Sequence, residues 1–226
     1  SYYYNPFMET FGMTNTQMGL CGTALGVGGI AAYLFGGIIC DYISIKKLIP
    51  AAMISTGALG LLMLTIPSPI IMVIIHGLFA ITCLMLFFPA QTKAVRNLAS
   101  VNEQGKAFGI FEGGRGISNA VYLAIAALIF GQMTILKNQS FGVRGIILFY
   151  STMTILLGVI DIVLLKGIDD GKKGDSNDTV NLKMLTKPLK MPAVWLMIGI
   201  IFSTLTISTG YYYISPYVTE VFGVSA

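Results

Sequence analysis

Six long apolar stretches alternate with short polar segments along the chain, at residues 17–39, 48–66, 70–94, 107–131, 146–166 and 193–213. A membrane-spanning helix needs about 20 consecutive, mainly apolar residues. In lipid, only helices and closed barrels satisfy every backbone hydrogen bond, and the short alternating strands of a barrel are absent from this sequence. The pattern therefore predicts an all-α, polytopic transmembrane helical bundle with six spans in this chain.

Local signals mark three helix starts. Thr14 and Gln17 have the spacing of a capping box before the first span. Asn102 is predicted to cap the fourth span, and Pro192 to lie in the first turn of the sixth.

Composition excludes several other classes of protein. Apolar residues make up 55% of the chain and charged residues only 11%, against about 25% charged residues in a soluble domain. A soluble domain, a disordered chain, a nucleic-acid binder and a disulfide scaffold are therefore excluded. The three cysteines lie in apolar stretches and there is one histidine, so neither a metal site nor a cofactor is expected.

Lysine and arginine residues predict the orientation in the membrane. Eleven basic residues lie in or beside the loop after the first span, the loop after the third span and the segment 167–190, whereas two lie on the opposite side. Because cytoplasmic loops carry the excess of positive charge, these three segments are predicted to be cytoplasmic. Residues 1–16, 67–69 and 132–145 and the C-terminus are predicted to face outward.

The two ends of the chain resemble each other. Residues 2–14 read YYYNPFMETFGMT and residues 211–225 read YYYISPYVTEVFGVS. Many transporters contain parallel repeats, so the chain is interpreted as one period of a protein of about 420 residues. Chance similarity between two segments rich in tyrosine and phenylalanine is the alternative.

A loop motif follows the first span. Gly37, Asp41, Lys46 and Lys47 match the loop between the second and third helices of the major facilitator superfamily, which this chain resembles. The match departs from the family pattern at Tyr42, Ser44 and Ile45. Asp41 is predicted to act as a conformational latch by accepting hydrogen bonds from a helix N-terminus in the other half of the protein. A plain positive-inside turn is the alternative.

The resemblance implies two six-helix bundles that rock about a central site, with this chain running from the end of helix one to the end of helix seven. Residues 1–166 would then be most of the N-terminal bundle, 167–190 a cytoplasmic linker, and 191–226 the first helix of the C-terminal bundle.

Two charged residues lie inside the fourth span. Glu112 and Arg115 are three residues apart and can form a pair on one helix face. Charged side chains in a membrane are costly, and a guanidinium group can hold an anion in a bidentate manner. Arg115 is therefore predicted to bind substrate together with Glu112, His76 and Asn119. A Glu112–Arg115 pair that only neutralises itself, and a neutral histidine hydrogen-bonded to a neighbouring group, are the alternatives.

Small residues recur every fourth position at Gly105, Gly109 and Gly113, which predicts a close contact with another helix. The surrounding segment FGIFEGGRGISNAV resembles helix five of the organophosphate:phosphate antiporters and related organic anion symporters. At the end of the sixth span, Tyr211, Tyr212 and Tyr213 are predicted to form an outer gate, with a simple aromatic belt as the alternative.

These features predict secondary active transport of a small organic anion (a sugar acid, phosphate ester or sulfonate) by symport or antiport, coupled to a proton, a cation or phosphate. The expected surroundings are the lipid bilayer of a bacterial inner membrane and the remaining helices of the full transporter. No phosphate-binding loop or catalytic motif is present, so an enzyme is not expected. A truncated, non-transporting fragment and a six-helix channel-like protein remain the alternatives.

Overall fold

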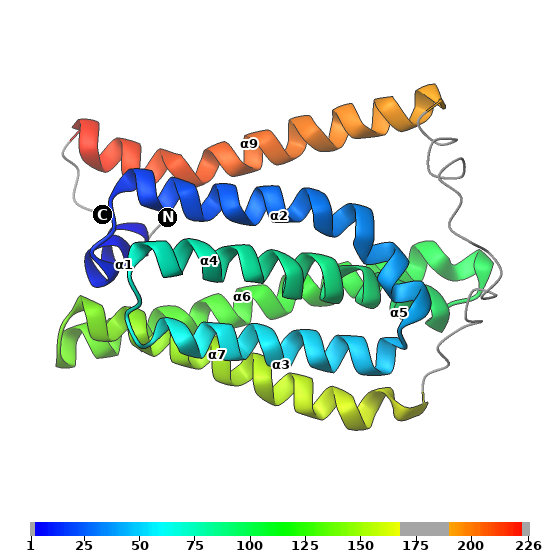
Figure 1. Ribbon diagram of the computed structural model, residues 1–226, viewed down its shortest axis with the longest axis horizontal. Helices are drawn as coiled ribbons and strands as arrows, with labels where there is room; N and C mark the ends of the chain where they lie inside the picture. Colours follow the sequence, from blue (N-terminus) through cyan, green and yellow to red (C-terminus); the bar gives the residue numbers. More distant parts are fainter. Residues whose placement is uncertain (1–2, 168–189, 223–226) are drawn as a thin grey trace. The chain divides into compact units, whose positions relative to one another are not determined.

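The computed structural model describes residues 3–167 and 190–222 (Figure 1). It divides into two compact units, Ser1–Phe7 with Asp175–Ala226 and Met8–Gly174. The helices of the first part of the chain are α1 (Tyr4–Phe11), α2 (Asn15–Tyr42), α3 (Ile45–Met63), α4 (Pro69–Phe79), η1 (Ala80–Phe87), α5 (Phe88–Leu98), η2 (Val101–Glu103), α6 (Gln104–Leu136), α7 (Gln139–Leu164) and η3 (Leu165–Gly167). In the last part, α9 runs over Pro192–Phe222.

The predicted class, a helical membrane bundle, is confirmed. Five described helical segments are long and apolar enough to cross a membrane, and they coincide with the first five predicted spans: Asn15–Tyr42, Ile45–Met63, Pro69–Leu98, Val101–Leu136 and Gln139–Gly167. The sixth prediction falls in α9, which begins at Pro192 as expected. Residues 168–189 of the predicted linker, and the side chains of Tyr211, Tyr212 and Tyr213, lie outside the described residues.

Two of the predicted helix starts can be compared with the structure. The capping box before α2 is present, because Gln17 donates its backbone N–H to Thr14 Oγ1 (3.3 Å) and Gln17 Oε1 accepts from the Thr14 N–H (2.9 Å). The prediction that Asn102 caps the fourth span is wrong. Asn102 lies inside the short helix η2, which leads directly into α6.

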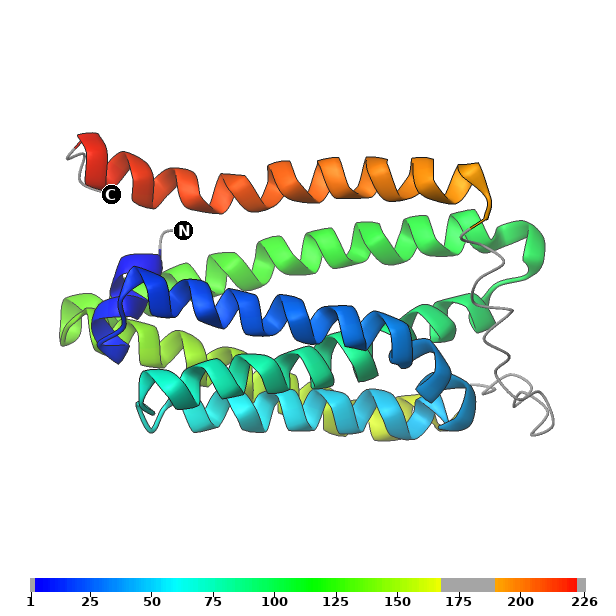
Figure 2. The ribbon, with the colours of Figure 1, turned by 45° about the horizontal axis from the view of Figure 1, so that its top comes forward.

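α3 and α7 pack against each other along their lengths, as Figures 1 and 2 show. The contact depends on small residues. A Cβ atom placed on Gly57 would lie 2.7 Å from the carbonyl oxygen of Ser151, and one on Gly60 would collide with the Ser151 hydroxyl. On α7, Gly158 is equally close to Met53 and Ile54. These glycines let the two backbones approach to van der Waals distance.

α2 packs against both α4 and η1. η1 is a π-helix, with the N–H of Phe88 bonded to the carbonyl of Cys83 five residues earlier. A Cβ on Gly36 would lie 2.7 Å from the carbonyl oxygen of Met85, so the wide π-helical segment lies directly against α2. Thr56 Oγ1 lies 3.5 Å from Cys83 Sγ and links η1 to α3.

The α2–α3 junction, the α5–α6 junction and the end of α7 lie at one end of this unit (Figure 1). A buried apolar cluster holds the ends of these helices together: Cys40, Ile45, Leu48, Ile49, Ala90, Ala94 and Leu165. The topology predicted from the basic residues requires the segments after the first, third and fifth spans to lie at the same end, as these three do.

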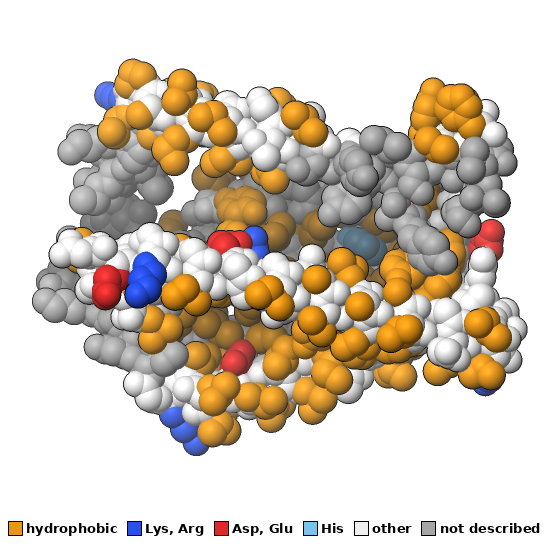
Figure 3. Space-filling view, turned by 180° about the vertical axis from the view of Figure 1, so that it is seen from behind, with side chains coloured by type: hydrophobic (Ala, Val, Ile, Leu, Met, Phe, Trp, Pro, Cys, Tyr) orange, Lys and Arg blue, Asp and Glu red, His pale blue; other side chains and the backbone are white. Residues whose placement is uncertain are grey.

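Large apolar side chains cover the outside of the described helices. Figure 3 shows hydrophobic side chains spread along the visible face, with few charged ones among them. Ile70, Ile110 and Val163 are each about two-thirds exposed or more. Such an apolar surface is suited to lipid and to contact with further helices.

Candidate functional site

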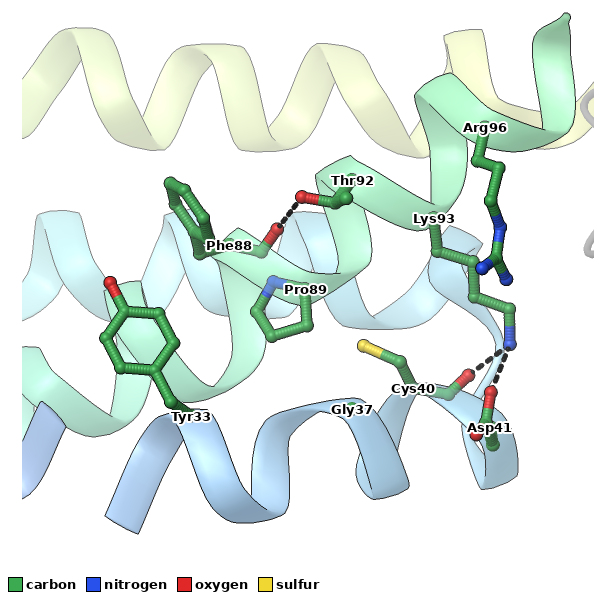
Figure 4. Close-up of a pocket in the computed structure, with 9 residues that line it drawn as sticks. All are labelled: Tyr33, Gly37, Cys40, Asp41, Phe88, Pro89, Thr92, Lys93 and Arg96. Carbon is green, nitrogen blue, oxygen red and sulfur yellow. Dashed lines mark hydrogen bonds and ion pairs between the residues drawn. The ribbon is translucent and has the colours of Figure 1, made fainter. Parts of the chain in front are cut away.

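A pocket of about 380 Å³ lies between α2 and α5, at the end of the unit predicted to be cytoplasmic (Figure 4). Its wall combines aromatic and basic side chains with part of the predicted latch motif: Tyr33, Gly37, Cys40, Asp41, Phe88, Pro89, Thr92, Lys93 and Arg96.

Lys93 joins the two helices in this pocket. Its Nζ donates to the backbone carbonyl of Cys40 (2.7 Å) and lies 3.2 Å from Asp41 Oδ1 (Figure 4). The lysine side chain is only 13% exposed, whereas that of Asp41 is 66% exposed. The cation therefore complements the negative end of the α2 dipole. The carboxylate stays accessible to a further donor.

The other residues of the motif have different surroundings. Lys46 Nζ donates to the backbone carbonyl of Lys166 (3.3 Å), so it caps the end of the segment that follows α7. Lys47 is exposed in the first turn of α3. Gly37 lines the pocket without a close neighbour, and the close helix approach within this unit falls one residue earlier, at Gly36.

Arg115 lies on α6, roughly 17 Å from the start of that helix. Its Nη2 is 2.6 Å from Glu112 Oε2, so the predicted pair is present, and both side chains are about half exposed. Glu112 occupies only part of the guanidinium fork, which has five N–H donors.

The same arginine lines a hollow of about 300 Å³ between α6 and α7. The lining side chains are Arg115, Ser118, Asn119 and Tyr122 of α6 and Tyr150, Met153, Thr154 and Leu157 of α7. Asn119 was predicted at this site. Ser118 and Tyr122 were missed, although their spacing of three and seven residues from Arg115 places them on the same helix face. The α7 residues have no such local signal.

His76 is not among the residues that line this hollow. Its Nδ1 donates to the carbonyl of Met72 (2.8 Å), and its ring meets that of Phe79 edge-on at 5.8 Å. This geometry corresponds to the alternative of a histidine hydrogen-bonded to a neighbouring group, here the backbone of its own helix.

The predicted contact at Gly105, Gly109 and Gly113 is not made within the described residues, since a Cβ on any of the three would meet no atom within 4 Å. It stays a prediction about further helices.

The whole chain, residues 1–226, matches the family model described as Major Facilitator Superfamily. The chain belongs to the major facilitator superfamily. It is thus an integral membrane protein of a superfamily of transporters. The pocket around Asp41 and Lys93 contains two residues, Gly37 and Asp41, of the loop motif by which the chain resembles this superfamily.

Two curated relatives come from Escherichia coli (strain K12). Inner membrane protein YqcE is 30% identical over 225 residues, which are 99% of this chain and 52% of YqcE. Inner membrane protein YihN is 26% identical over 224 residues, which are 97% of this chain and 52% of YihN. The chain therefore spans about half the length of these relatives. No solved structure matches it significantly.

We expect Asp41→Asn in the complete protein to slow turnover by about two- to fivefold while the KM changes little. The substitution removes the charge that pairs with Lys93 at the junction of α2 and α5. An exposed ion pair contributes up to about 1 kcal/mol, which is enough to change the barrier between two conformations by this factor. Initial rates of uptake over a range of solute concentrations measure both quantities.

Glu103→Gln is the matched control for this variant, because Glu103 is an exposed carboxylate at the same end of the unit whose described hydrogen bond is to Ser100. It should leave turnover unchanged. A raised KM with unchanged turnover in Asp41→Asn would contradict the latch.

Proposed function

We propose that the complete protein is a secondary active transporter of a small organic anion, and that Arg115 binds the anionic group. The observation that carries this proposal is a guanidinium group within a membrane span that lines a hollow of about 300 Å³. Small-molecule sites begin at about this volume. A carboxylate, phosphate or sulfonate is the natural partner of a guanidinium fork.

Glu112 has two uses in this proposal. Its carboxylate lies 2.6 Å from the Arg115 guanidinium group and offsets the cost of a charge in the membrane. When the anion binds, Glu112 either stays on one side of the guanidinium group or takes up a proton, and the second case would couple transport to protons. A co-transported cation or exchanged phosphate is the other form of coupling that we propose.

The mechanism that we propose is alternating access. Superfamily membership supports it, as does the pocket that joins Asp41 of α2 to Lys93 of α5 next to a helix junction. The names of YqcE and YihN, both inner membrane proteins, support a location in a bacterial inner membrane. We place the transporter near the organophosphate antiporters and organic anion symporters, on the resemblance of the segment around Arg115.

Counterflow into proteoliposomes tests this function with the complete protein. Vesicles are loaded with unlabelled glucuronate, glycerol 3-phosphate or ethanesulfonate, and the entry of the same labelled anion is followed. An alternating-access transporter should show saturable entry that the internal anion accelerates. Entry that neither saturates nor responds to the internal anion would indicate a channel and overturn the proposal.

A further inference from the structure

Two tyrosine rings form one wall of the hollow that contains Arg115. Tyr122 of α6 and Tyr150 of α7 lie nearly parallel, with ring centroids 6.3 Å apart and an interplanar angle of 23°. Phe149 packs beside both rings, at 5.5 Å from Tyr150 and 5.8 Å from Tyr122, but does not line the hollow. The two tyrosines therefore supply the aromatic surface of this wall.

The chemistry of the hollow changes along its length. Arg115 supplies the charge at one end, and Tyr122 follows two helical turns later, roughly 10 Å along the α6 axis. Met153 and Leu157 line the hollow on the α7 side, and because α7 runs antiparallel to α6 they lie toward the Arg115 end (Figure 1). Ser118 and Asn119 lie between the charge and the rings in the α6 sequence and supply a hydroxyl and an amide. The site therefore favours an anionic group at the Arg115 end and a flat ring at the Tyr122–Tyr150 end.

We propose that Tyr122 and Tyr150 make this site selective for anions that carry a ring. This inference rests on the proposed function of Arg115 and adds the shape of the ligand body. A ring presents a flat face of C–H groups or π electrons that packs on a tyrosine ring without losing conformational freedom. An acyclic anion of the same charge must be held in one conformation to make the same contact, which costs entropy. Ser118 and Asn119 hydrogen-bond the polar edge of the ring.

Equilibrium binding to the complete protein with two matched pairs of probes tests the proposal. Glucuronate is compared with gulonate, its acyclic reduction product of equal charge, and glucose 6-phosphate with sorbitol 6-phosphate. Calorimetric titration should give a Kd about three- to tenfold lower for the cyclic member of whichever pair binds, the ratio expected of one aromatic contact. Tyr150→Leu should bring this ratio close to one, whereas Tyr150→Phe, which keeps the ring, should retain it.

Phe149→Leu is the matched control, because Phe149 belongs to the same ring cluster but does not line the hollow. It should leave the ratio unchanged even if it lowers the stability of the protein. Equal affinity for the cyclic and acyclic probes, or a preference that survives Tyr150→Leu, would overturn the role of the rings and leave the anion transporter intact. Absence of binding by all four probes would overturn both proposals.

Discussion

Arg115→Ala in the complete protein is expected to lower anion uptake by at least about thirtyfold while membrane insertion stays normal. Removal of a charged hydrogen-bonding partner from a bound anion costs roughly 2 kcal/mol or more, because the anion loses its bidentate contact in a site of low dielectric. Arg115→Lys keeps the charge but not the planar fork, so it should recover only part of the activity. Uptake into proteoliposomes, normalised to the amount of inserted protein, measures both variants.

Lys106→Ala is the control for this experiment, since Lys106 is a cation of the same helix that does not line the hollow. It should transport like the unmodified protein. Unchanged uptake kinetics in Arg115→Ala would show that Arg115 only pairs with Glu112, and the substrate would then have to bind elsewhere.

The second large effect is expected at the contact between α3 and α7. Gly57→Val should lower the free energy of unfolding by roughly 1–3 kcal/mol or more, because even a Cβ at this position lies 2.7 Å from the Ser151 carbonyl and the branched side chain adds two further groups. The backbone of α7 would have to move away to relieve the collision. The melting temperature of the protein purified in detergent measures the loss.

Ala58→Val provides the comparison, because Ala58 is the next residue of the same helix and is exposed. The substitution enlarges a side chain that lies outside the α3–α7 contact, so it should shift the melting temperature little. Equal losses from the two substitutions would mean that valine disturbs α3 itself rather than its packing.

The sequence predicted the features that depend on local patterns. Long apolar runs located the spans, and the Thr14–Gln17 capping box and the Glu112–Arg115 pair depend only on spacing along one helix. The helix of the fourth predicted span, α6, extends to Leu136, five residues beyond the predicted end of that span. Apolar content locates the part of a helix that lies in lipid and does not indicate how far the helix continues beyond it.

Features that depend on contacts between helices were missed. Nothing next to Lys93 in the sequence indicates that it bonds to Asp41, 52 residues earlier. Gly57 and Gly60 pack against α7 although α3 has fewer glycines per turn than α6, on whose glycines a Cβ would meet no described atom within 4 Å. Glycine density alone therefore did not indicate which helix faces meet.

α1 ends at Phe11, the residue that the predicted repeat pairs with Phe222, and Gly12 follows it. Gly12 has a positive φ of 59°, a conformation that glycine adopts without strain. The division of the chain into one repeat period stays a prediction.

The π-helical segment Ala80–Phe87 has a consequence for how this protein tolerates changes in length. Its hydrogen bonds place more residues in each turn than an α-helix does. Loss of one residue here could convert part of the segment to ordinary α-helix while α4 and α5 keep the faces that they turn toward α2. The same deletion in the middle of α3 or α7 would rotate every later residue away from its partner. Single-residue deletions accepted during evolution should therefore gather at Ala80–Phe87 rather than in the neighbouring spans.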